Sequence, residues 1–160
     1  MADEEFENTD AGASKTEKVE SQRLKNGSLV MMKGFPCKVT DVSTAKPGKH
    51  GSAKAMITAK DIFTDKQYEE TFGTGDMIPA PIVTKQEYTC LDVDQDGAMT
   101  LMDNDGGMKE DLNLPTTSHM ADTVKDLKRI LEAGKKECLV TVQKWGDKES
   151  VYSVREGAEQ

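Results

Sequence analysis

Alternating apolar and polar residues predict short β-strands in the first half of the chain. Residues 29–32 form an apolar run, and residues 37–42 alternate with the period of two that a half-buried strand produces. Residues 33–36 between them are typical of a turn. The same short pattern recurs at residues 53–59 and 67–72. Several short strands without a helical period predict a small β-barrel.

The second half of the chain combines strands with one predicted helix. From residue 119 to 133 apolar side chains recur at steps of three and four, with Ser118 as a possible cap and Gly134 as the expected end. Strands are predicted over residues 88–93, 98–102, 138–142 and 150–154. With turns at 94–97 and 103–107, the second of which leads into a third strand, the order is three strands, a helix and two strands. This is the element order of an OB-fold barrel.

Two stretches indicate how the chain is divided. Residues 1–20 contain almost no large apolar side chain, so burial cannot offset the entropy of ordering them, and we predict a disordered acidic tail there. Residues 78–82 hold two prolines two positions apart, which interrupt a hydrogen-bonded ladder and stiffen an extended connector. We therefore expect two small β domains, over residues 21–83 and 84–160.

Charge is distributed unevenly over these segments. The formal net charge is -8, made up of -5 in residues 1–20, +3 in residues 21–83 and -6 in residues 84–160. Because only the middle segment is positive, it is the one expected to face phosphate groups. The acidic remainder argues against indiscriminate nucleic-acid binding, and we expect no DNA partner.

The cysteines and histidines indicate a reducing compartment and no metal site. Cys37, Cys90 and Cys138 lie far apart without a Cys-x-x-Cys pair, which is typical of buried thiols. His50 and His119 are too few for a zinc site. The chain begins Met-Ala-Asp-Glu-Glu with no apolar run behind it, so we expect neither a signal peptide nor a membrane span. We predict a cytoplasmic protein without a bound cofactor.

Candidate chemistry is concentrated in residues 43–54, which contain three lysines and no acid. Gly48 and Gly51 flank Lys49 and His50, and glycine reaches positive φ at little cost, so a sharply turned tip can present both side chains outward. In an acidic chain, this local basic patch predicts an anionic partner. A solvated basic hairpin tip is the alternative interpretation of the same residues.

The sequence of residues 43–54, Ser-Thr-Ala-Lys-Pro-Gly-Lys-His-Gly-Ser-Ala-Lys, resembles the modified-lysine loop of the eukaryotic translation initiation factor 5A family. The resemblance continues through residues 61–69 and 110–115, in the order and at the spacing of that family. Pro47 and Ser52 depart from the usual sequence of that family, which more often has threonine at the first of these positions and histidine at the second. The resemblance implies an SH3-like barrel over residues 21–83 and an OB-fold domain over residues 84–160.

The function that this resemblance implies depends on Lys49. In that family the apical lysine is lengthened with an aminobutyl group from spermidine by deoxyhypusine synthase and then hydroxylated by deoxyhypusine hydroxylase, which gives hypusine. Such a factor binds the ribosome beside peptidyl-tRNA, promotes peptide-bond formation at stalled or proline-rich sequences and assists termination. We accordingly expect a translation factor acting in protein biosynthesis, in elongation as well as initiation, that is itself no enzyme.

The resemblance also implies roles for the residues around Lys49. Gly48 and Gly51 form a turn without side chains on either side of Lys49 and His50. His50 makes a neighbouring contact, and Lys46 and Lys54 make flanking contacts to RNA phosphate. For Lys46 and Lys54, solvated surface lysines remain the alternative interpretation.

Two other functions are open. A general single-stranded RNA-binding protein would stack bases on aromatic rings of the OB-fold, for which Tyr88, Trp145 and Tyr152 are available after residue 81. Trp145 is equally compatible with a core residue at a turn. An enzyme using Lys49 as an amine nucleophile would require a desolvated lysine beside an acid or base, and a basic, glycine-flanked tip argues against it.

Residues 92–103 imitate a calcium-binding loop, with acids at the first, third, fifth and twelfth positions and glycine at the sixth. The twelfth residue is Asp103 in place of the usual glutamate, and the flanking segments alternate as strands do. A hairpin turn at Asp96 and Gly97 is therefore the preferred interpretation.

Overall fold

The computed structural model describes residues 15–45 and 53–160 of the chain. Two compact units, residues 1–82 and 83–160, make up the chain. Their division falls one residue before the boundary expected from the sequence. Among the described residues, no helix is long and apolar enough to cross a membrane.

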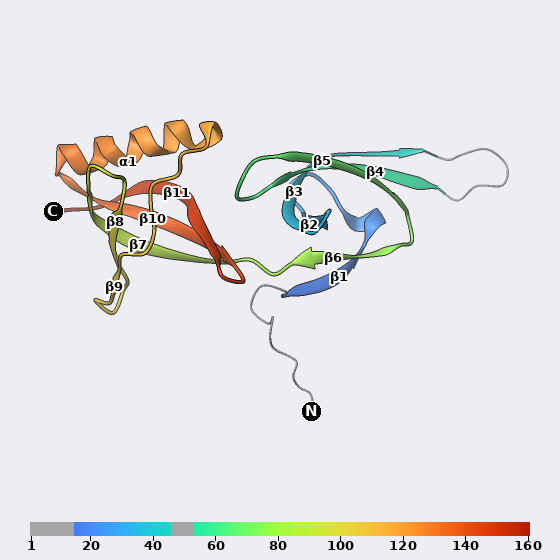
Figure 1. Ribbon diagram of the computed structural model, residues 1–160, viewed down its shortest axis with the longest axis horizontal. Coiled ribbons are helices and arrows are strands. Elements are labelled where there is room, and N and C mark those ends of the chain that lie inside the picture. The colour runs from blue at the N-terminus through green and yellow to red at the C-terminus, as the bar shows by residue number, and fades with distance from the viewer. Residues whose placement is uncertain (1–14, 46–52) are drawn as a thin grey trace, which may run out of the picture. The chain divides into compact units, whose positions relative to one another are not determined.

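The N-terminal unit consists of a four-stranded antiparallel sheet, in the order β2-β3-β4-β5, and a two-stranded ladder of β1 and β6 (Figure 1). The strands are β1 (Thr16–Glu20), β2 (Leu29–Met32), β3 (Phe35–Ala45), β4 (Lys54–Asp61), β5 (Gln67–Gly73) and β6 (Met77–Pro81), with a short 3-10 helix η2 (Ser21–Arg23) after β1. The strands predicted at 29–32, 37–42, 53–59 and 67–72 are therefore present, within a few residues at their ends.

The ladder between β1 and β6 corrects two expectations. Residues 16–20, predicted to belong to a disordered tail, form strand β1, and residues 78–82, predicted to be a connector, largely form β6. The N–H of Ile82 donates to the carbonyl of Lys15 at 3.1 Å. Because successive N–H groups alternate in direction, Pro79 and Pro81 place their nitrogens on the side away from β1, where no ladder bond is lost. The remaining tail residues, 1–14, lie outside the described residues.

The turn between β2 and β3 is shorter than predicted. Lys33 and Gly34 have φ values of 54° and 87°, so two residues with positive φ make the hairpin connection. Phe35 and Pro36, which the sequence pattern placed in the turn, are the first residues of β3.

The core of the N-terminal unit lies on one face of these strands. Alternation buries Val30 and Met32 in β2, Cys37 and Val39 in β3, and Ile57 in β4. Burial and, secondly, the nearby charge of Asp61 raise the pKa of Cys37 to about 12, which keeps this thiol protonated and unreactive.

The C-terminal unit is a five-stranded antiparallel sheet, in the order β11-β10-β7-β8-β9, covered by one helix (Figure 1). Its elements are β7 (Thr84–Val93), β8 (Met99–Met102), β9 (Met108–Lys109), the 3-10 helix η3 (Ser118–Met120), α1 (Ala121–Ala133), β10 (Lys136–Trp145) and β11 (Lys148–Glu159). This is the predicted order of three strands, a helix and two strands.

The ends of α1 confirm one prediction and correct another. Gly134 ends the helix with a φ of 62°, and its N–H donates to the carbonyl of Ile130 at 3.3 Å. Ser118 does not cap the helix. It begins the 3-10 turn η3, and Met120 occupies the cap position of α1 without a side-chain hydrogen bond.

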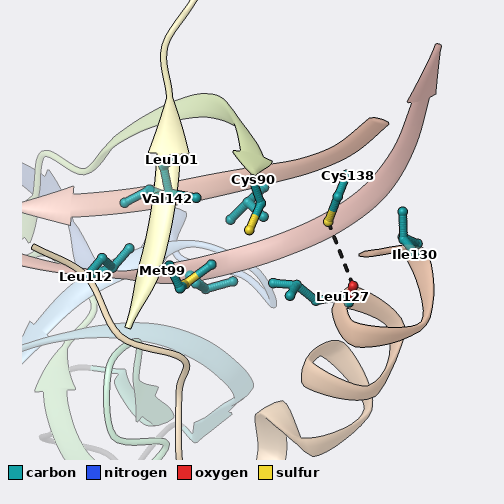
Figure 2. Packing of buried hydrophobic residues seen from close by; sticks show 10 residues of the cluster. Cys90, Met99, Leu101, Leu112, Leu127, Ile130, Cys138 and Val142 are labelled. Carbon is teal, nitrogen blue, oxygen red and sulfur yellow. Dashed lines mark hydrogen bonds between the residues drawn. The ribbon is translucent and has the colours of Figure 1, made fainter. Parts of the chain in front are cut away.

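Helix α1 packs on the inner face of the sheet through Leu127 and Ile130 (Figure 2). The carbonyl of Leu127 accepts a weak bond from the Cys138 thiol, with sulfur and oxygen 3.9 Å apart. Cys138 lies directly opposite Cys90 across β10 and β7. All three cysteines are buried and free, which agrees with the expectation of buried thiols.

The segment that imitates a calcium loop contains a hairpin turn. One oxygen of Asp94, Oδ1, accepts from the N–H groups of Asp96 and Ala98, both at 2.9 Å. The next turn repeats this arrangement, with Asp103 Oδ1 accepting from Asp105 at 2.9 Å and from Gly107 at 2.7 Å. The first aspartate of each turn, Asp94 or Asp103, thus stabilises that turn by accepting backbone hydrogen bonds within it, which is common for aspartate in loops.

An ion-pair network joins the two edge strands of the C-terminal sheet. Lys109 Nζ in β9 lies 2.8 Å from Glu149 Oε1 in β11 and 2.8 Å from Asp111 Oδ1. Burial disfavours the charged lysine, but the hydrogen bonds to Asp111 and Glu149 outweigh it and raise the pKa of Lys109. The hydrogen bond from Lys109 lowers the pKa of Asp111. Side chains thereby bridge the gap between the edges of the sheet.

Replacing Lys109 with methionine is expected to lower the free energy of unfolding by about 1 kcal/mol at pH 7, because charge-assisted bonds to two carboxylates are lost. The lowered pKa of Asp111 stabilises the fold above pH 3.8, its ordinary pKa, and this contribution disappears as acid protonates the folded carboxylate. The difference between wild type and variant should therefore shrink toward pH 2. Urea unfolding followed by Trp145 fluorescence measures it. Lys128→Met, an exposed change on α1, should show neither effect.

Candidate functional site

Five of the six predicted site residues, Lys46, Gly48, Lys49, His50 and Gly51, lie outside the described residues. The sixth, Lys54, is the exposed first residue of β4. The structure therefore describes the hairpin of β3 and β4, which is the stem that carries the basic segment, residues 46–53.

The register of the hairpin fixes both ends of the basic segment. Strands β3 and β4 pair without interruption from Asp41 opposite Thr58 to Ala45 opposite Lys54. A β-bulge between Val39 and Asp41 bends β3 below this stretch. Ala45 and Lys54 form the last pair, so residues 46–53 leave from and return to adjacent points of one sheet.

Strand β5 supports the returning end of the basic segment. Lys54 pairs with Gly73 on its other side. One residue earlier, the carbonyl of Ala53 accepts from the N–H of Thr74 at 3.2 Å. The start of β4, where the chain returns from the basic segment, is thus held between β3 and β5.

A polar cluster around the buried Ser21 fixes Gly73 in turn. The hydroxyl of Ser21, a fully buried residue of η2, donates to the carbonyl of Gly73. The N–H of Gly73 donates to Asp76 Oδ2 at 2.9 Å, and the N–H of Ser21 donates to the carbonyl of Asp76 at 2.9 Å. Sequence reasoning missed these residues. The turn-forming run at residues 73–76 was the available signal, but only the fold brings Ser21 beside it.

The three rows of paired residues at the end of the stem contain no acid, and the Asp76 carboxylate lies beside them on the N–H of Gly73. The last three rows of paired residues across β3, β4 and β5 are Ala45, Lys54 and Gly73, then Thr44, Ala55 and Phe72, then Ser43, Met56 and Thr71. Lys54 stands between two residues without long side chains. A negatively charged partner can therefore approach Lys54 closely without meeting a carboxylate in these rows.

The aromatic residues considered for RNA stacking do not form a platform. Tyr88 packs against the core of the C-terminal unit, and Trp145 is only 8% exposed. Tyr152 is exposed, but Lys85 Nζ lies over its ring, 3.7 Å from the centroid. The described part of the OB-fold domain thus lacks the open row of rings that base stacking uses.

Two protein-family models match the chain, one over each half. Residues 14–76 match the family model described as "Translation initiation factor 5A-like, N-terminal". Residues 82–155 match the model described as "Eukaryotic elongation factor 5A hypusine, DNA-binding OB fold". The chain belongs to the translation initiation factor 5A family. It is accordingly a translation factor of protein biosynthesis, and this implies an interaction with the ribosome.

Relatives in this family match along nearly the whole chain. Initiation factor 5A from Dictyostelium discoideum is 45% identical over 95% of this chain and 92% of its own length. Initiation factor 5A-3 from Arabidopsis thaliana is 37% identical, with 98% of each chain covered. The predicted identity from residues 43–54, 61–69 and 110–115 is therefore confirmed.

Solved structures of the initiation factor 5A family have the same fold. A family protein from Naegleria fowleri superposes with a TM-score of 0.75 at 36% identity, covering 89% of this chain and 99% of its own. Initiation factor 5A from Methanococcus jannaschii gives a TM-score of 0.68 at 25% identity, covering 89% and 97%. The predicted fold class, mostly β with an SH3-like barrel followed by an OB-fold domain with one helix, is confirmed.

Proposed function

We propose that this protein carries hypusine at Lys49 and uses it on the ribosome to promote peptide-bond formation at stalled or proline-rich sequences, and also to assist termination. The observation that carries the proposal is the acid-free end of the β3–β4 stem, fixed from Ala45 to Lys54, from which the basic segment leaves. Membership of the initiation factor 5A family supports the same assignment.

The proposed modification takes its chemistry from spermidine. Deoxyhypusine synthase transfers an aminobutyl group from spermidine to the amine of Lys49, with 1,3-diaminopropane as the leaving product, and deoxyhypusine hydroxylase then adds a hydroxyl group with molecular oxygen as the oxidant. The product is a longer side chain with two cationic amines, which can follow a narrow RNA-lined channel beyond the reach of an ordinary lysine. Its amines would contact phosphate and sugar oxygens, which fix position without reading sequence.

The proposed mechanism is orientation of a substrate that another catalyst transforms. Peptidyl-tRNA ending in proline is a poor reactant, and holding its acceptor end in attack geometry lowers an entropic barrier. No covalent step falls to the protein itself, so it acts in the cytoplasm as an assistant to the ribosome and not as an enzyme.

The neighbouring residues have supporting roles in this proposal. Gly48 and Gly51 form the bare turn on which Lys49 is presented, and His50 makes an adjacent contact. Lys46 and Lys54 bind flanking phosphates. The support of the Lys54 backbone by Gly73 and the Ser21–Asp76 cluster favours a fixed contact for Lys54, because less backbone freedom is lost on binding.

Peptide mass spectrometry across residues 46–54, on protein purified from its own source, tests this proposal. The expected result is a mass increase equal to one aminobutyl and one hydroxyl group on Lys49, with Lys46 and Lys54 unmodified. Protein made in a host without the two modifying enzymes is the control and should carry plain lysine. An unmodified Lys49 in fully active native protein would contradict the proposal.

A further inference from the structure

A row of side chains crosses the outer face of the C-terminal sheet, the face opposite α1. In register from one edge of the sheet to the other, Met108 pairs with Met102, Met102 with Thr89, Thr89 with Leu139, and Leu139 with Arg155. Neighbouring strands are about 4.8 Å apart, so the row extends about 19 Å. Four of its five members end in methyl groups.

The alternation of the strands places this row outward. Its members lie between core residues: Thr89 between Tyr88 and Cys90, and Leu139 between Cys138 and Val140. Met108 is 52% exposed. Leu91, the extra residue of the bulge in β7, adds a further side chain that is 48% exposed, two positions from Thr89. Met102, Thr89 and Leu139 are half-buried, and together with the two exposed side chains they form one methyl-bearing stripe along the paired strands, which isolated surface hydrophobics do not.

A glycine keeps the Leu139 end of the row flat. A Cβ added at Gly157 would lie 2.8 Å from Leu139 Cδ1, so the side chain of Leu139 occupies the space that any other residue would fill. Leu139 is thereby spread over β11 beside Arg155. Arg155 is itself held by two bonds to Glu87, at 2.8 and 3.0 Å, so its charge is compensated.

Acidic residues dominate the stretch of sequence that contains the methionine end of the row. Between residues 91 and 112 there are seven acids and one base, Lys109, which is already paired with Asp111 and Glu149. The acids are Asp92, Asp94, Asp96, Asp103, Asp105, Glu110 and Asp111, and all except Asp103 are exposed. Residues 91–112, with Lys109 included, carry a net charge of -6, which equals that of the whole 84–160 segment.

We propose that this outer face docks a basic protein segment that inserts apolar side chains between Met108, Met102 and Leu139. Adaptable methionines favour contacts with a protein surface, and the carboxylates of residues 91–112 attract lysine and arginine. The same carboxylates repel RNA phosphate, and the row contains no aromatic ring on which a base could stack. The two units then have separate partners, RNA for the basic hairpin and protein for this face. The inference rests on the proposed function in placing that partner on the ribosome.

Two lysine substitutions distinguish the possible occupants. In the double variant Met102→Lys and Met108→Lys, a basic protein partner loses its apolar contacts and meets new repulsion, so binding to salt-washed ribosomes should weaken by about tenfold or more in a sedimentation assay. Stronger binding would show RNA on this face and overturn the proposal, and unchanged binding would overturn it as well.

Ala121→Lys with Ala133→Lys is the matched control, because it adds the same charge on α1, on the other side of the sheet. An equal loss in this control would show a nonspecific charge effect and overturn the proposal.

A photo-cross-linking side chain at position 108 in the otherwise wild-type, modified protein gives a second readout that does not depend on altered charge. The expected product is an adduct with a ribosomal protein, identified by mass spectrometry, whose cross-linked peptide is rich in lysine or arginine. An adduct with ribosomal RNA, or no adduct, overturns the inference.

Loss of activity in a Lys49 variant together with normal binding of the double methionine variant would refute this inference alone. Failure of modified wild-type protein to bind ribosomes would refute both proposals.

Discussion

Replacement of Lys49 with arginine should reduce the rate of peptide-bond formation on a proline run by about 10- to 100-fold in a reconstituted translation system, the size of effect that lost positioning produces. Arginine keeps the positive charge of position 49 but offers no primary amine to which the aminobutyl group can be transferred. The expected loss thus reports the missing extension and not a missing charge. Rates with modified wild type and with the variant are measured on the same proline-containing message.

Lys54→Arg is the matched control for this experiment. Lys54 is exposed at the first position of β4, and arginine retains the charge that would bind phosphate. We expect a change of at most about twofold, because phosphate contacts contribute position through charge. A Lys49→Arg protein as active as modified wild type would contradict a role for the modification, whereas equal losses in both variants would indicate that arginine disturbs the hairpin itself.

Replacement of Leu127 with alanine should lower the free energy of unfolding of the C-terminal unit by about 3 kcal/mol. Leu127 of α1 is fully buried against the sheet, in the cluster that includes Cys90, Cys138 and Val142 (Figure 2). Alanine leaves a cavity there and removes the main anchor of the helix. Trp145, the only tryptophan of the chain, belongs to this unit, so its fluorescence during urea unfolding reports the change.

The control for Leu127→Ala is Lys128→Ala, one position further along the same helix but exposed. Both substitutions introduce the same helix-favouring residue, so their difference isolates the cost of the cavity. We expect Lys128→Ala to change the free energy of unfolding by less than about 0.5 kcal/mol. Equal midpoints for the two variants would show that α1 contributes little to the stability of this unit.

Local patterns predicted most of the strands because those strands are buried on one face only. Residues 37–42 and 67–72 alternate visibly, and the helix ending at Gly134 shows its period of three and four. The pattern failed at β1 and β6, where prolines and an acidic composition argued against pairing. Each of these strands needs the other for its ladder, and residues 16–20 and 77–81 are far apart in sequence.

The candidate site shows a similar division. The residues of the basic segment could be named because glycine and lysine are informative at a turn whatever surrounds them. The cluster of Ser21, Gly73 and Asp76 could not, because Ser21 meets the other two only through the ladder of β1 and β6. In the same way, nothing in the local pattern marks Met102, Met108 and Leu139 as neighbours before the strand order is known.

The amino-acid sequence by itself determined the family, the fold class, the separation of charge between the two halves and the candidate lysine at position 49. These properties depend on residue identity and on spacing along the chain. The tertiary structure decided where β1 and β6 pair, how the end of the β3–β4 hairpin is held, and that four apolar or methyl-bearing side chains form one outer row. These features arise from contacts between residues distant in sequence, whose register no local pattern specifies.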